Sequence, residues 1–78
     1  MSTINYTPQQ RRERLALQVA NYATSKNLAR HEVDNVVLAA TNAFDKDLTP
    51  ATCYEIGRKA TDMLAGAHYI EVHAVLFA

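Results

Sequence analysis

Two Thr-Pro pairs, at residues 7–8 and 49–50, each stand directly before a run of apolar residues with helical spacing. Threonine is a good helix N-cap, and proline suits the first helical position because the N–H it lacks would have no partner there. Gln10 also lies at the third helical position after Thr7, which completes a capping box. Helices with such starts fill most of a 78-residue chain, so we expect one mainly α domain, residues 1–78.

The spacing of the apolar residues predicts three helices. The first covers residues 8–25, the second covers residues 28–44 behind an N-cap at Asn27, and the third covers residues 50–65 and ends at Gly66. Their expected apolar stripes are Leu15, Val19 and Tyr22; Val33, Val37, Ala40 and Phe44; and Cys53, Ile56, Ala60 and Met63 or Leu64. No internal repeat is evident.

A glycine interrupts the third predicted helix. Gly57 costs about 1 kcal/mol there relative to alanine, and this cost indicates a close helix crossing.

The two ends of the chain follow other patterns. Residues 2–7 alternate, which predicts a short extended segment or strand. Residues 67–78 are rich in β-branched and aromatic residues, and we favour a strand there, with a fourth helix as the alternative. A lone apolar strand needs a partner, so we expect a homo-oligomer. The residues expected at its interface are Tyr69, Ile70, Val72, Val75 and Phe77.

The zero net charge is the sum of two unequal parts. Residues 1–30 hold five basic residues and one acidic residue, net +4, whereas residues 31–78 hold three basic and seven acidic residues, net −4. Arg11, Arg12 and Arg14 crowd a helix start, where the helix dipole favours anions instead. Because these arginines do not stabilise their own helix start, we predict that they bind a partner.

Little in the chain indicates metal, cofactor or membrane chemistry. Its single cysteine, Cys53, excludes an internal disulfide and a thiolate cluster, and indicates a reducing, cytoplasmic compartment. We expect no metal, no cofactor, no signal peptide and no membrane-spanning segment.

Catalytic residues are equally hard to find. His68 and His73 are five residues apart, a spacing that does not bring them together on a strand or a helix, and His31 has only Asp34 nearby. Cys53 belongs to an apolar stripe, where a small buried residue is usual. We therefore expect no enzyme.

The segment TINYT, followed by two helices, resembles the ribbon-helix-helix family of DNA-binding proteins. The resemblance covers residues 3–44 and implies a dimer whose strands lie in the major groove. It also implies that Thr3, Asn5 and Thr7 contact bases. The first predicted helix is about one turn longer than in that family, and the chain has no net positive charge to attract phosphates. Nucleic-acid binding is therefore our alternative hypothesis.

Our first hypothesis is a small protein-interaction module. The short chain, the lack of catalytic residues and the uneven charge all favour it. Small domains of this kind are common among phage and mobile-element accessory proteins, so we expect a protein partner and inhibition of a larger host complex.

Overall fold

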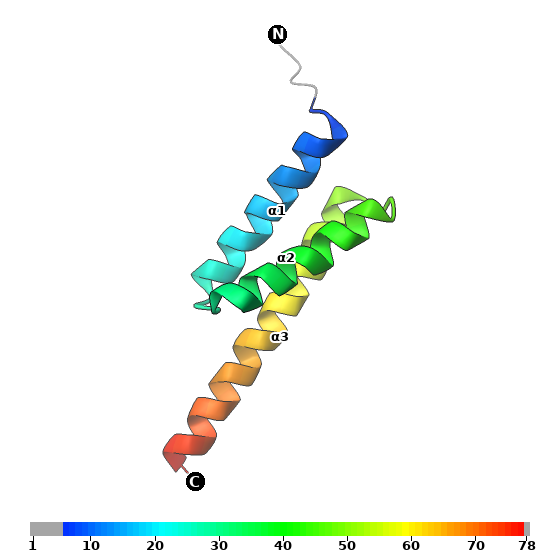
Figure 1. Ribbon diagram of the computed structural model, residues 1–78. Coiled ribbons are helices and arrows are strands. Elements are labelled where there is room, and N and C mark those ends of the chain that lie inside the picture. The colour runs from blue at the N-terminus through cyan, green and yellow to red at the C-terminus, as the bar shows by residue number, and fades with distance from the viewer. Residues whose placement is uncertain (1–5, 78) are drawn as a thin grey trace.

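The protein is a mainly α domain, as the sequence predicts. The computed structural model describes residues 6–77, with side chains for residues 6–67. It contains helices α1 (Pro8–Ser25), α2 (Arg30–Asp45) and α3 (Pro50–Phe77). Helices α1 and α2 run in opposite directions, and α3 packs against both of them (Figure 1).

Two of the helices begin at the predicted threonines. Thr7 Oγ1 accepts a hydrogen bond from Gln10 N at 3.1 Å, and Thr7 N donates to Gln10 Oε1 at 2.9 Å, so the capping box is confirmed. Thr49 Oγ1 accepts from Thr52 N at 3.2 Å at the start of α3. Both caps satisfy backbone N–H groups that have no partner within the helix.

The prediction that Asn27 is the N-cap of α2 is wrong. Asn27 has φ 63° and belongs to the end of α1, because its N–H donates to Thr24 O at 3.0 Å and the next N–H, of Leu28, donates to Ala23 O at 3.3 Å. This pair of bonds is the Schellman motif, which needs a residue in the left-handed region. Helix α2 starts three residues later, at Arg30.

The α2–α3 turn repeats the α1–α2 turn twenty residues later. Asp47 has φ 65°, its N–H donates to Phe44 O at 3.0 Å, and Leu48 N–H donates to Ala43 O at 3.3 Å. Both turns share the pattern Ala-x-x-Lys-(Asn/Asp)-Leu, starting at Ala23 and Ala43. This short repeat was missed in the sequence, where asparagine was read as a helix start.

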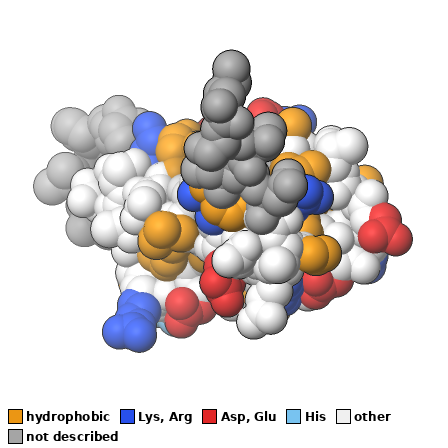
Figure 2. Space-filling model, turned by 90° about the horizontal axis from the view of Figure 1, so that it is seen from above, with side chains coloured by type: hydrophobic (Ala, Val, Ile, Leu, Met, Phe, Trp, Pro, Cys, Tyr) orange, Lys and Arg blue, Asp and Glu red, His pale blue; other side chains and the backbone are white. Residues whose placement is uncertain are grey.

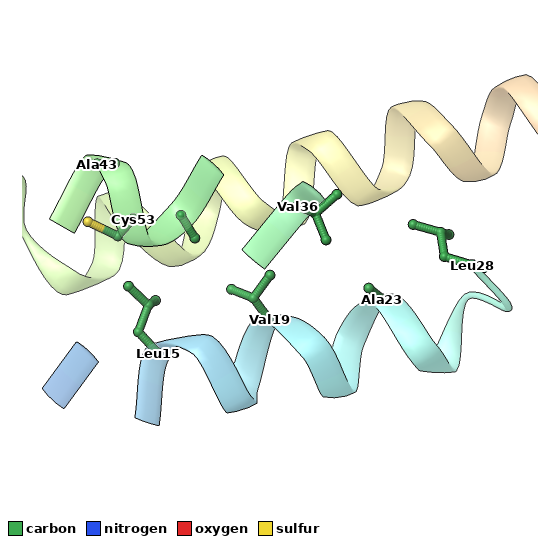
Figure 3. Close-up of a cluster of buried hydrophobic side chains, with 8 residues drawn as sticks. Leu15, Val19, Ala23, Leu28, Val36, Ala43 and Cys53 are labelled. Carbon is green, nitrogen blue, oxygen red and sulfur yellow. The ribbon is translucent and has the colours of Figure 1, made fainter. Parts of the chain in front are cut away.

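The core lies where the three helices meet (Figure 3). Gly57 of α3 confirms the predicted close crossing, since a Cβ added there would lie 2.7 Å from Val19 Cγ1 and 3.3 Å from Ala40 Cβ. Tyr22, predicted on the core stripe of α1, is only half-buried, and Ala23 takes its place. The buried apolar residues are Leu15, Val19, Ala23, Leu28, Val36, Ala40, Ala43 and Cys53.

The prediction that the third helix ends at Gly66 is wrong. Residues 67–77 form neither the predicted strand nor a separate fourth helix, because they continue α3. It runs without a break from Pro50 to Phe77, 28 residues, or about 42 Å at 1.5 Å per residue. Its last turns extend beyond the α1–α2 pair (Figure 1). The pattern after Gly66 was misread because β-branched and aromatic residues favour strands only where a neighbouring strand pairs with them.

The expected N-terminal strand falls largely outside the described residues, which begin at Tyr6. Within the described part, Tyr6 and Thr7 have no regular secondary structure.

Candidate interaction surface

Of the three arginines at the start of α1, Arg12 forms an ion pair within the described part of the molecule. Its Nε lies 3.0 Å from Asp45 Oδ1 and its Nη2 lies 3.2 Å from Asp45 Oδ2, which is a two-pronged ion pair. Asp45 is the last residue of α2, so the pair joins the start of α1 to the end of α2. Both side chains remain about half exposed, at 44% and 53%, and an exposed pair contributes at most about 1 kcal/mol to stability.

Arg11 and Arg14 lie together on another side of α1. The guanidinium carbon of Arg14 stands 4.5 Å from the centre of the Tyr6 ring, a cation–π distance. Both arginines line a hollow of about 180 Å³. Its other lining residues are Tyr6, Leu15, Gln18 and Pro50. The structure therefore separates the predicted three-arginine site into a pair around one hollow and a third arginine in an ion pair.

The end of the molecule that carries the α1 start has a mixed charge. Lys and Arg side chains alternate with Asp, Glu and apolar side chains over this face (Figure 2). Glu13, for example, lines a neighbouring hollow together with Arg14. Arg11 and Arg14 are thus a local basic pair within a mixed surface.

A second, larger hollow of about 560 Å³ lies between α1 and α3. Its walls are Gln18, Asn21 and Tyr22 of α1, and Tyr54 of α3. Gln18 also lines the hollow beside Arg11 and Arg14, so the two hollows adjoin.

Tyr22, which lines this second hollow, also contacts α3 and Lys26. Its hydroxyl donates a hydrogen bond to Asp62 Oδ1 at 2.6 Å, which ties α1 to α3. Lys26 Nζ lies 5.5 Å from the centre of the Tyr22 ring. The pKa of the Tyr22 phenol is raised, first by the hydrogen bond to Asp62 and then by desolvation and the negative charge of Asp62.

The side chains considered for catalysis lie apart or outside the described residues. Cys53 is fully buried, burial raises the pKa of its thiol, and the thiol lies 3.6 Å from Leu48 O. His31 is exposed, and the side chains of His68 and His73 lie outside those described. Among the side chains that the structure describes, no three His, Cys, Asp or Glu residues gather as a metal site would require.

In the described part of the chain, no helix combines the length and the apolar character that crossing a bilayer requires.

The predicted DNA-contacting residues and the predicted oligomer interface lie mostly outside the described side chains. Thr3 and Asn5 precede the described residues, and the hydroxyl of Thr7 is used as the cap of α1. The interface residues expected at 69–77 belong to α3, but their side chains lie outside those described.

Tyr6, Gln18 and Tyr54 are the surface residues that sequence reasoning missed. A signal existed for Tyr6, because it directly precedes the N-cap Thr7, and side chains at that position often fold back onto the first turn. Gln18 and Tyr54 come together only through the packing of α1 on α3, which no local pattern encodes.

A comparison with protein-family models, with curated proteins and with solved structures finds no match to this chain.

Proposed function

We propose that this chain is a non-enzymatic protein-interaction module that binds an acidic surface of a larger complex and inhibits that complex. The observation that carries the proposal is the pairing of Arg11 with Arg14 around one hollow, with Tyr6 stacked on Arg14. Arginine and tyrosine are enriched at the centres of protein interfaces, where the guanidinium group binds carboxylates.

The ion pair of Arg12 sets Arg11 and Arg14 apart as the arginines that would bind a partner. Arg12 stabilises the contact between α1 and α2, whereas no such pair explains Arg11 or Arg14 among the salt bridges of the described residues. Both arginines are exposed, and Arg11 lies next to the first turn of α1, where a cation is unfavourable, so a partner's carboxylates would relieve a local cost there.

The test is a double charge reversal, Arg11→Glu with Arg14→Glu. Arg30→Glu with Lys59→Glu is the matched control, because both residues are exposed, neither lines the hollows described above, and the pair changes the net charge by the same amount. The immobilised protein is exposed to a lysate of its source organism, and captured proteins are compared by mass spectrometry. We expect a captured protein that the double variant loses and the control keeps, although the double variant melts no lower than the unchanged protein. Equal capture by all three proteins would refute the proposal.

We also propose self-association through the end of α3. In support, α3 continues beyond the α1–α2 pair (Figure 1), and its sequence there includes Tyr69, Ile70, Val72, Val75 and Phe77. A helix that is apolar over most of its circumference is stable only when it is covered. Light scattering at micromolar concentration should give a multiple of 8.7 kDa, and a mass of one chain would contradict self-association.

A further inference from the structure

The two hollows beside α1 form one groove along the line where α1 meets α3. The first hollow has Arg11 and Arg14 on its α1 side and Pro50 on its α3 side. The second has Asn21 on its α1 side and Tyr54 on its α3 side, and Gln18 lines both. We call this continuous surface, from Arg11 to Tyr22, the α1/α3 groove.

The side chains of the groove are of the kind that binds a peptide. Gln18 and Asn21 carry carboxamides, which both donate and accept hydrogen bonds and so match the N–H and C=O groups of an extended backbone. Tyr22 and Tyr54 add rigid aromatic surface with a polar tip, a combination enriched in protein interfaces.

Positive charge stands at both ends of the groove. Arg11 and Arg14 stand at one end, and Lys26 stands over Tyr22 at the other. Asp62 also lies at the Lys26 end, where it accepts the hydrogen bond of the Tyr22 hydroxyl, and Arg58 of α3 acts on the same phenol, so that end holds two cations and one carboxylate. Arg14 and Lys26 are twelve residues apart on and just after α1, which corresponds to about 18 Å.

The middle of the groove carries no charge of its own, because Gln18, Asn21 and Tyr54 are neutral. An extended peptide covers about 18 Å with five or six residues, so carboxylates at its two ends would reach both basic ends of the groove. A nucleic acid fits less well, because phosphates recur along its whole backbone and need cations throughout.

We propose that the α1/α3 groove binds an extended acidic segment of the partner, with carboxylates at its ends and neutral residues between them. This inference rests on the proposed function, since it uses Arg11 and Arg14 as one end of the site.

The test uses fluorescence anisotropy at low salt with a fluorescein-labelled peptide, EEAAAAEE, in which glutamate pairs flank four alanines. Gln18→Glu places a negative charge in the middle of the groove, on an exposed residue. Gln9→Glu is the matched control, because Gln9 is also exposed on α1, adds the same charge, and lies half a helical turn away in projection. We expect Gln18→Glu to weaken peptide binding about tenfold, and Gln9→Glu to leave it within about twofold. Circular dichroism melts check that both variants fold.

The outcomes separate the groove from the proposed function. If Arg11→Glu with Arg14→Glu abolishes binding but Gln18→Glu does not, the groove is wrong and the basic pair stands. If EEAAAAEE does not bind, the acidic segment is wrong, and the proposed function is still decided by the capture experiment. If EEAAAAEE binds and the double reversal does not weaken it, the basic pair is wrong as well. If KKAAAAKK binds as well as EEAAAAEE, the charge argument is wrong. Tighter binding of a twelve-residue oligothymidine than of the peptide would replace the acidic segment with a nucleic acid.

Discussion

Helix α3 is packed against α1 and α2 along residues 50–65, and its backbone continues as a helix from Gly66 to Phe77. Along residues 50–65, the side chains of Cys53 and Thr61 are fully buried, and Gly57 is packed against Val19. Gly66 and Ala67 are exposed, and a Cβ added at Gly66 would meet no atom within 4 Å beyond its chain neighbours and its own helix backbone. The comparison teaches that a helix can continue through positions, here Gly66 and Ala67, that its neighbouring helices leave exposed.

The largest contrast concerns thiol reactivity. Cys53 is fully buried and burial raises the pKa of its thiol, so it reacts only when the helices open. A second protein carries Cys53→Ala and Ala67→Cys, which moves the thiol to an exposed position past Gly66. We expect the moved thiol to react with Ellman's reagent more than about a hundredfold faster, as a stopped-flow or absorbance trace would show. Similar rates would mean that the core opens easily.

The next contrast is steric. Gly57→Ala brings a methyl group to 2.7 Å from Val19 Cγ1, and neither helix can yield without loss of packing. Overpacking costs about 1–3 kcal/mol and the better helix propensity of alanine returns up to about 1, so we expect a net loss of about 1–2 kcal/mol. Chemical denaturation measures this change.

A double-mutant cycle tests whether the clash with Val19 causes the stability loss of Gly57→Ala. Val19→Ala alone leaves a cavity, but combined with Gly57→Ala it makes room for the new methyl group. The double variant should be clearly more stable than the sum of the two single changes predicts. Strict additivity would show that the crossing is not as close as the structure places it.

Gly66→Ala should have the opposite sign. Nothing lies within 4 Å of the added Cβ, and Gly66 is inside a helix. We therefore expect a gain of about 0.5–1 kcal/mol in the free energy of unfolding, from helix propensity and a less flexible unfolded chain. A loss of stability in the same denaturation experiment would show that α3 ends near Gly66 in solution.

The smallest expected effect is on the titration of the Tyr22 phenol. Asp62 lies near the end of the packed residues 50–65, and its hydrogen bond raises the pKa of the Tyr22 phenol above the ordinary tyrosine value. Because the pKa is raised in the folded state, the stabilising bond is complete below the ordinary pKa and is lost as the pH rises through the raised one. Asp62→Ala should return one of the four tyrosines to ordinary titration, which absorbance at alkaline pH would detect. An unchanged titration curve would mean that the bond does not form.

Local sequence patterns predicted much of this fold. The caps at Thr7 and Thr49 gave correct starts for α1 and α3, because capping depends on a few adjacent atoms. Gly57 correctly marked a close crossing, since a glycine inside a helix needs a reason. Asn27 was misread because asparagine suits both a helix start and the left-handed position after a helix end, and the choice depends on where the next helix packs.

The candidate site was harder to predict than the fold. The sequence indicated a basic cluster at Arg11, Arg12 and Arg14, but only the packing of α2 on α1 assigned Arg12 to Asp45. Tyr54 and Gln18 line one hollow because α3 lies along α1, and residues thirty-six positions apart carry no local signal of that arrangement.

By itself, the sequence determined three things about this protein: its helical class, the starts of α1 and α3, and its uneven charge. Each follows from interactions within a few residues, such as caps, apolar spacing and side-chain ionisation. The tertiary structure alone decided which arginine is paired, which tyrosines line the α1/α3 groove, and that α3 continues past Gly66. Those outcomes depend on which surfaces the helices bury against each other, and that choice minimises the free energy of the whole chain rather than of any one segment.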